Sequence, residues 1–368
     1  MIDVAMMRSF SFDQGTGVAT FGGGARNSEI FAKFPPLRVA ITHGRCASVG
    51  VAGLVLGGGI GFNMRARGLT CDQLVATEMV TADGAILTVS PTENQELYWA
   101  CRGAGGGNFG INTAFHFQTF PVGSLTVYEL AWDDKPEDIF AALTAALERA
   151  PSTLGCKVTA EVKSENGRHG IEVQLLGQIT GTKAELLEIL QPVYAIATPS
   201  GFIEETTYWR GQQSLIEAGE PAYYNERSRF FDQSFDDRAV ATVFEWMVKQ
   251  PGAIRSRRFS IFQTGKHVNV VAPAATAFVH RRSHWVSTIA LTWTKSTPAN
   301  VVADNLGWQT EFYDAIVPIA KGGAYQNFID PNLKNWRAAY YGANLTRLES
   351  IKQRVDPDHV FAFPEAIP

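Results

Sequence analysis

The chain has 368 residues, of which 45% are hydrophobic and 18% are charged, and its formal net charge is −4. This composition is typical of an ordered globular protein of about two domains. No block of basic residues is present, which argues against nucleic acid as a partner. No apolar run is long enough to cross a bilayer, and the N-terminus lacks the features of a signal peptide, which favours a cytoplasmic location.

The region before residue 122 predicts short elements separated by glycine-rich turns. The expected elements are a strand at 18–21, a helix at 28–34, a hairpin over 74–89, a helix at 93–101 and a strand at 111–119. Asp83-Gly84 forms the expected hairpin turn, and Thr92 is the expected N-cap of the second helix.

Beyond Pro121-Val122-Gly123 the chain predicts longer helices and strands with fewer glycines. The expected helices cover 136–150, 183–195, 237–249 and 299–319, and the expected strands cover 157–162, 171–179, 259–264, 267–271 and 285–294. The first two strands are expected to pair through Asn166-Gly167. This pattern predicts an α+β region in which helices cover one face of a sheet. A final helix is expected at 345–354, before Asp356-Pro357.

The stretch 43–61 combines a cysteine, Cys46, with two clusters of glycines. Glycine has no Cβ, so a backbone rich in it can approach a ligand closely. The alternative is a glycine-rich turn between two strands with a buried structural cysteine. A Rossmann dinucleotide loop is disfavoured, because a GxGxxG frame that starts at Gly57 places Phe62 at the third glycine.

The other cysteines are Cys71, Cys101 and Cys156, and we expect them to be core residues. No CxxC pair and no His/Cys cluster with zinc spacing occurs, so no metal site is predicted.

Three separated groups of residues together resemble one family. The first comprises Gly44-Arg45-Cys46, Val49-Gly50-Val51-Ala52-Gly53, Gly57-Gly58-Gly59-Ile60-Gly61, Arg67-Gly68-Leu69, Asp72, Asp83-Gly84 and 103–110; the second is 275–281; the third comprises Tyr340-Tyr341-Gly342, Asn344, Leu348, Lys352, Asp356-Pro357 and Phe361. In this order they resemble the berberine-bridge-enzyme-like FAD-linked oxidoreductases of the vanillyl-alcohol-oxidase superfamily.

The resemblance implies an α+β fold with a PCMH-type FAD-binding domain formed by both chain ends and an inserted substrate domain of antiparallel sheet and helices. We therefore expect the second lobe of the FAD-binding domain at 1–122, the substrate domain at 123–331 and, at 332–368, a berberine-bridge-type segment that returns to the FAD-binding domain. Family members also carry an N-terminal lobe with an Arg-Ser-Gly-Gly-His loop, which nothing here resembles. The resemblance thus implies either a fragment or a remnant that binds FAD poorly, and no second covalent flavin bond.

The implied activity is hydride transfer from an alcohol or hemiacetal carbon of a sugar or natural product to flavin N5, with O₂ as acceptor. Cys46 resembles the cysteine that bonds flavin C6, and we expect the neighbouring Arg45 or His43 to lower its pKa. The alternative for Cys46 is a buried free thiol. Tyr325, followed by Asn327 and Phe328, resembles the phenolic base of the family, for which a positive neighbour or the flavin must lower the pKa. A core tyrosine is the alternative.

The remaining expected cofactor contacts come from the same motifs. They are Val49, Gly50, Gly53, Gly58, Gly59, Gly61, Val80, Asn108, Gly110, Tyr341 and Asn344. The glycines would let backbone N–H groups reach the flavin and its diphosphate. For Tyr341 and Asn344, helix packing and N-capping are equally good explanations. Two other functions stay open: a catalytically silent chain that binds no FAD, and a dehydrogenase that avoids O₂, with Val51 as the candidate residue beside flavin C4a.

Overall fold

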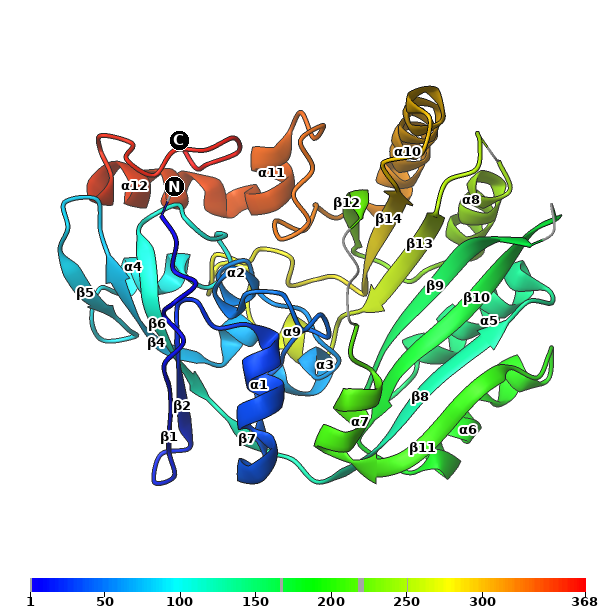
Figure 1. The fold of residues 1–368 in the computed structure, drawn as a ribbon, viewed down its shortest axis with the longest axis horizontal. Coiled ribbons are helices and arrows are strands. Elements are labelled where there is room, and N and C mark those ends of the chain that lie inside the picture. The colour runs from blue at the N-terminus through cyan, green and yellow to red at the C-terminus, as the bar shows by residue number, and fades with distance from the viewer. Residues whose placement is uncertain (1, 166–167, 218–221, 250) are drawn as a thin grey trace.

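The computed structural model describes residues 2–165, 168–217, 222–249 and 251–368. Within these residues two antiparallel sheets lie beside one another, and helices near the C-terminus lie across the top of the first (Figure 1). The first sheet has the order β1 (Phe10–Asp13), β2 (Val18–Gly22), β6 (Ile111–Gln118), β4 (Leu74–Val80) and β5 (Ile86–Val89). A small pair, β3 (Val39–Ala40) and β7 (Phe120–Pro121), and the helices α1 (Asn27–Lys33), α2 (Val51–Leu56), α3 (Met64–Arg67) and α4 (Gln95–Ala100) complete this half.

The second sheet is larger. Its strand order in the described residues is β11 (Ser200–Thr207), β8 (Ser124–Trp132), β10 (Arg168–Ile179), β9 (Leu154–Glu165), β13 (Ser256–Gln263), β14 (Trp285–Trp293) and β12 (Tyr223–Phe231). Its helices are α5 (Pro136–Glu148), α6 (Lys183–Tyr194), α7 (Tyr208–Ser214), α8 (Asp237–Met247) and α10 (Ala299–Ala320). The short helix α9 (His267–Val270) instead packs against α3 of the first half (Figure 1).

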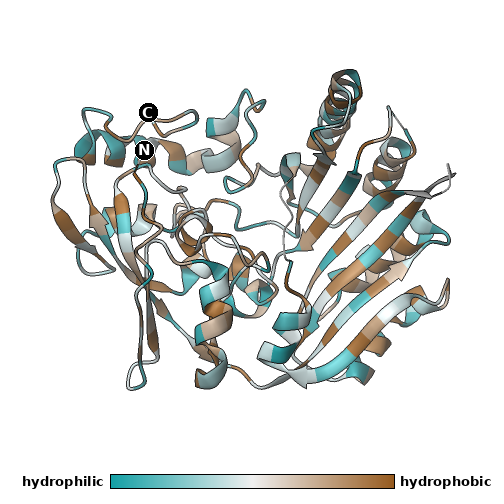
Figure 2. Ribbon diagram, in the orientation of Figure 1, coloured by the Kyte–Doolittle hydropathy of each residue, from teal (hydrophilic) through white to brown (hydrophobic). Residues whose placement is uncertain are grey.

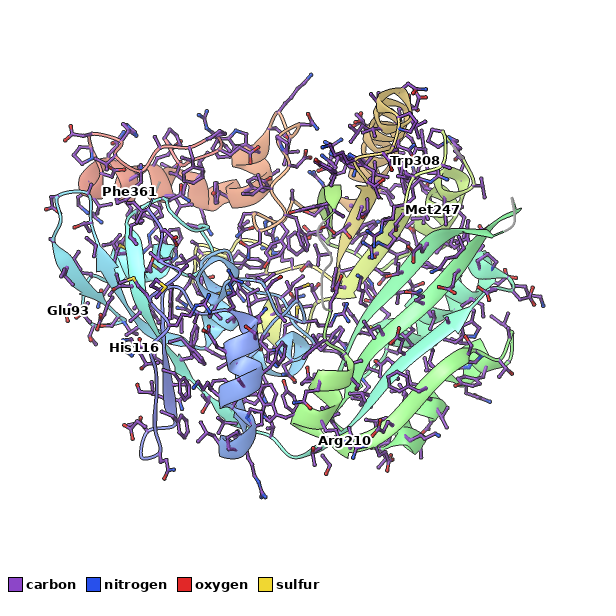
Figure 3. The ribbon with its side chains drawn as sticks, viewed as in Figure 1. Glu93, His116, Arg210, Met247, Trp308 and Phe361 are labelled. Carbon is purple, nitrogen blue, oxygen red and sulfur yellow. The ribbon has the colours of Figure 1, made fainter. Side chains whose placement is uncertain are left out.

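Alternation along the strands gives this sheet one apolar and one polar face, visible as alternating colours in Figure 2. On the apolar face the Phe259 ring lies 6.2 Å from Phe140 of α5 and 5.6 Å from Phe312 of α10. Figure 3 labels Met247 and Trp308, where α8 and α10 pack against each other. The opposite face carries polar side chains such as Lys157 and Thr159, and it is turned toward the first half.

The segment after α10 returns to the first half through α11 (Trp336–Tyr341) and α12 (Leu345–Val355). Lys352 and Asp356 form a fully buried ion pair of 2.6 Å. The Lys352 ammonium also donates to the carbonyls of Asn108 and Phe361, at 2.7 and 2.8 Å. Because a buried charge needs both a counter-ion and hydrogen bonds, these contacts account for the burial of this charged pair at the C-terminal end of α12.

Most predicted elements are confirmed, with ends shifted by a few residues. The Asp83-Gly84 hairpin joins β4 and β5 as expected. Strands β9 and β10 pair as expected, although Asn166-Gly167 lies outside the described residues. The predicted N-cap Thr92 is wrong, because α4 begins at Gln95 with Asn94 as its N-cap.

The strand predicted at 267–271 is wrong, since α9 occupies these residues. Gly265 and Lys266 have φ values of +82° and +51°, which turn the chain away from an extended course. Val268 is buried while Val270 is 76% exposed, so the two valines point to opposite sides rather than sharing a strand face. The sequence pattern did not predict the helices α2, α3 and α7 or the strands β8, β11 and β12.

Candidate active site

The first glycine cluster belongs to helix α2, which begins after Gly50. Val51, Leu54 and Val55 bury one face of the helix, whereas Gly50 and Gly53 are exposed on the other. A Cβ built on Gly50 or Gly53 meets no atom within 4 Å. Glycine inside a helix costs about 1 kcal/mol relative to alanine, and no contact within the described chain requires it at Gly53.

The second cluster, Gly57 to Gly61, is packed against the chain itself. A Cβ on Gly57 would lie 2.0 Å from Asn327 Oδ1, and one on Gly59 would lie 2.2 Å from Thr70 Oγ1. Gly61 would meet the His43 carbonyl at the same 2.2 Å. The N–H of Gly58 donates to Val55, and the N–H of Gly59 donates to Tyr325 Oη at 3.0 Å. Packing within the chain therefore explains Gly58, Gly59 and Gly61, which were expected to contact the cofactor.

Cys46 lies half-buried at the junction of the two halves. A bridge pairs it in parallel with Glu217, and its thiol donates to Glu217 Oε2 at 3.5 Å. Burial, followed by the charge of Glu217, raises the pKa of Cys46 to about 11. The charge of Arg45 lowers the pKa of Cys46 as expected, but burial and Glu217 outweigh it, and Arg45 is itself paired with Glu217 at 2.9 Å. The expectation for His43 is wrong, because burial lowers the pKa of His43 to about 4 and leaves it neutral at pH 7.

His43 ends a buried chain of hydrogen bonds that joins the Cys46 loop to the second sheet. Its Nδ1 lies 3.1 Å from the Gly44 carbonyl, which can only accept, so Nε2 accepts from Tyr208 Oη at 2.9 Å. Asn63 Nδ2 donates to Tyr208 Oη, Gln178 donates to Asn63 Oδ1 at 2.7 Å, and Gln212 donates to Gln178 at 2.6 Å. Every donor points the same way along this chain, which fixes the loop relative to β10 and α7.

A polar pocket opens beside Cys46 on the polar face of the second sheet. Arg45 and Glu217 line it from the first half and the loop after α7, and Lys157, Thr159, Gln174 and Arg258 line it from β9, β10 and β13. Burial, reinforced by the charge of Arg45, lowers the pKa of Lys157. Sequence analysis missed these residues; the alternation of Lys157, Thr159 and Glu161 was a usable signal, whereas nothing local marks Glu217.

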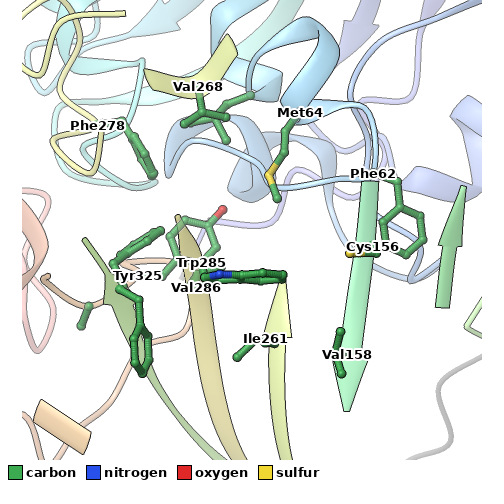
Figure 4. Close-up of a cluster of buried hydrophobic side chains, with 14 of the residues drawn as sticks. Phe62, Met64, Cys156, Val158, Ile261, Val268, Phe278, Trp285, Val286 and Tyr325 are labelled. Atoms are coloured by element: carbon green, nitrogen blue, oxygen red, sulfur yellow. The ribbon is translucent and has the colours of Figure 1, made fainter. Parts of the chain in front are cut away.

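Tyr325 lies in the buried junction between the halves, among Phe278, Val286 and Trp285 (Figure 4). Its Oη accepts from the Gly59 N–H and from Asn327 Nδ2, both at 3.0 Å. Burial raises the pKa of Tyr325 to about 12, although both donors favour the phenolate. The positive neighbour expected for a base is not among the groups that shift this pKa in the described structure.

The remaining expected cofactor contacts fall into three groups. Val49 is 41% exposed beside Gly50, which leaves it open to a ligand. Asn108, Tyr341 and Asn344 are buried and bonded within the chain: Asn108 Oδ1 accepts from Ile367, Tyr341 Oη donates to Ala104, and Asn344 Nδ2 donates to carbonyls of 273–277. Val80 lies in β4, and a Cβ on Gly110 would press on Met79 at 2.7 Å.

A flavin cofactor fits the open side of this site. The helix face at Gly50 and Gly53 would be filled by a side chain at either position, and Cys46 lies in the adjoining loop. Asn27 donates to the Cys46 carbonyl at 3.0 Å, and its buried Oδ1 has no hydrogen-bond partner among the described residues. The part of the chain that the structure describes holds no group of three or more potential metal ligands, and none of its helices is long and apolar enough to cross a membrane.

Comparison with known proteins places this fold among the FAD-binding proteins. A model of the FAD binding domain matches residues 1–90, and one described as berberine and berberine like matches 324–368. The uncharacterized FAD-linked oxidoreductase YgaK of Bacillus subtilis is 30% identical over 100% of this chain and 81% of its own length. The chain belongs to the berberine-bridge-enzyme-like family of FAD-linked oxidoreductases, which confirms the resemblance found in the sequence.

Solved structures show the same fold. Physcomitrella patens BBE-like 1 has a TM-score of 0.86 and 27% identity, over 99% of this chain and 80% of that protein. Xylooligosaccharide oxidase from Myceliophthora thermophila, in complex with xylobiose, has a TM-score of 0.85 and 26% identity, over 100% of this chain and 81% of that protein. The expected α+β fold with antiparallel sheets is therefore confirmed.

Proposed function

We propose that this FAD-linked oxidoreductase oxidises an alcohol or hemiacetal carbon of a sugar or related natural product, with O₂ as electron acceptor. When bound, the flavin supplies a two-electron acceptor for hydride at N5. The observation that carries the proposal is the exposed glycine face of α2, which follows the Cys46 loop in the chain, together with the polar pocket of the second sheet, which Arg45 of that loop lines. A hydroxyl-rich substrate fits such a pocket, and the similarity to a xylooligosaccharide oxidase supports this class.

Two residues of the chain have proposed roles in this reaction. Cys46 tethers the flavin at C6, and Tyr325 takes the substrate hydroxyl proton. The N–H donors from Gly59 and Asn327 stabilise the phenolate that this step requires. Since burial raises the pKa of Tyr325 to about 12 even with these donors in place, the bound flavin and substrate must supply the rest of the stabilisation.

The test begins with purified protein incubated with FAD. We expect a flavin absorption spectrum, flavin that stays with the protein after acid precipitation, and flavin release in Cys46→Ala. Hydrogen peroxide should form with members of a panel of oligosaccharides and simple alcohols. A colourless protein after FAD incubation would support the catalytically silent alternative, and substrate-dependent flavin reduction without peroxide would indicate a dehydrogenase.

Tyr325→Phe tests the base. We expect kcat to fall by about 100-fold or more with flavin content unchanged, because general-base catalysis contributes about 10²–10⁴. Tyr98→Phe is the matched control, since it removes a phenolic hydroxyl of α4 that donates to the Leu74 carbonyl at 2.6 Å. Equal kcat values for the two variants would exclude Tyr325 as the base.

A further inference from the structure

The contact between Cys46 and Glu217 is set by the backbone as well as by side chains. The two residues are 171 positions apart, yet they pair in a parallel bridge, and the Glu217 N–H donates to the Arg45 carbonyl at 3.3 Å. Arg45 Nη1 also donates to the Leu215 carbonyl at 2.9 Å. The main chain thus holds the Glu217 carboxylate beside the thiol, with Oε2 at 3.5 Å from Sγ.

Nearby positive charges keep Glu217 ionised. Burial would raise the pKa of Glu217, but the charges of Lys157 and Arg45 more than offset it, so the pKa lies below its usual range. Cys46 has the opposite tendency, because burial and the carboxylate both favour the protonated thiol. Since the thiolate is the nucleophile of cysteine chemistry, the thiol must lose its proton when it reacts, and a charged acceptor is already in contact with it.

The other nearby titratable groups are unsuited to accept this proton. His43 has both ring nitrogens engaged, by Gly44 and Tyr208, and belongs to the buried hydrogen-bond chain. Arg45 and Lys157, whose charges reach the thiol, are cations. Among the described residues, Glu217 is the carboxylate that the thiol contacts.

We propose that Glu217 is the general base that removes the Cys46 proton when the thiol couples to flavin C6. The inference rests on the proposed function, which supplies the tether and O₂. In the net reaction a sulfur–carbon bond forms, and the thiol and C6 each lose one hydrogen. The thiol proton passes to Glu217 and then to solvent. O₂ takes up the two electrons released and, with two protons, becomes hydrogen peroxide, so each tether formed yields one peroxide without substrate.

The experiment measures two rates, alkylation of Cys46 and covalent incorporation of FAD, which a substitution of Glu217 should change in opposite directions. Glu217→Gln removes the charge that raises the thiol pKa, so alkylation of Cys46 by iodoacetamide near neutral pH should rise by about 3-fold: roughly tenfold more thiolate, partly offset by lower nucleophilicity. The rate of covalent FAD incorporation, followed by acid precipitation and peptide mass, should instead fall by about 100-fold because the base is lost. Cys46→Ala supplies the background from the buried cysteines.

Glu204→Gln is the matched control. Glu204 also pairs with an arginine, Arg210, and its side chain has the same 43% exposure as that of Glu217. This variant should leave both rates unchanged, and Glu217→Asp should recover part of the coupling rate. Faster coupling in Glu217→Gln, in step with faster alkylation, would show that the carboxylate only suppresses the thiol and would overturn the proposal. If unmutated protein incorporates no covalent flavin, the tether itself fails, which is a separate outcome.

Discussion

The two glycine clusters of the Cys46 stretch look alike in sequence but serve opposite purposes in the structure. Gly57 and Gly59 are glycines because side chains of the same protein, Asn327 and Thr70, occupy the space that a Cβ would need. Gly50 and Gly53 have open space at the same position. The first pair is thus explained by folding alone, whereas the second pair leaves open space in which the flavin that we propose could approach the backbone closely.

The largest expected effect comes from the packed cluster. Gly59→Ala forces a non-glycine residue to φ +87° and places a Cβ 2.2 Å from Thr70 Oγ1. Backbone strain of about 1–3 kcal/mol and a similar cost of overpacking should together lower the free energy of unfolding by about 3 kcal/mol or more. Urea denaturation measures this loss. A variant as stable as the unmutated protein would show that packing does not require glycine at this position.

A pH-dependent change of comparable size in the free energy of unfolding tests the burial of His43, which packs against Gly61 of this cluster. The His43 carbonyl blocks a side chain at Gly61, and the His43 ring is buried and neutral with a pKa of about 4, against a usual 6.5. Below pH 6.5 the unfolded chain binds a proton that the folded chain does not. Stability from this residue is therefore complete above pH 6.5 and is lost as the pH falls toward 4, by about 3 kcal/mol in all.

Comparison with His43→Gln isolates this contribution. His280, whose pKa burial lowers to about 3, adds a similar dependence to both proteins and cancels in the difference. The stability advantage of the unmutated protein over the variant should shrink as the pH falls from 6.5 to 4. A difference that stays constant over this range would mean that His43 does not titrate as a buried neutral group.

The sequence predicted the regular parts of the fold because their pattern is local. Strands such as β9 and β13 alternate apolar and polar residues, because helices cover one face of their sheet and the other face is polar. Strand β8 was missed because Thr126, Val127 and Tyr128 are all buried, which removes the alternation. Helix α2 was missed because glycine content argues against a helix, and burial of Val51, Leu54 and Val55 outweighs that preference.

The site was predictable only where a motif carried it. Cys46 and Tyr325 were found through the family resemblance, which the comparisons support at the level of the family. The environment that sets the pKa values of these two residues could not be predicted, because it arises from tertiary contacts. Glu217 lies 171 positions from Cys46, and Gly59 lies 266 positions from Tyr325. The charge of adjacent Arg45 lowers the pKa of Cys46 as expected, but burial and that distant carboxylate raise it by more.

The smallest effect on stability separates the two clusters most sharply. Gly53→Ala adds a methyl group to an exposed helix position with nothing within 4 Å, so it should raise the free energy of unfolding by up to about 1 kcal/mol. If FAD lies against this face, the same methyl group occupies its space, and FAD affinity measured by flavin fluorescence should fall by about 10-fold or more, which corresponds to about 1.4 kcal/mol. A variant that is more stable but binds FAD more weakly cannot be explained by a glycine with a purely structural role. Unchanged FAD affinity in a stabilised variant would place the cofactor elsewhere and remove the distinction between the two clusters.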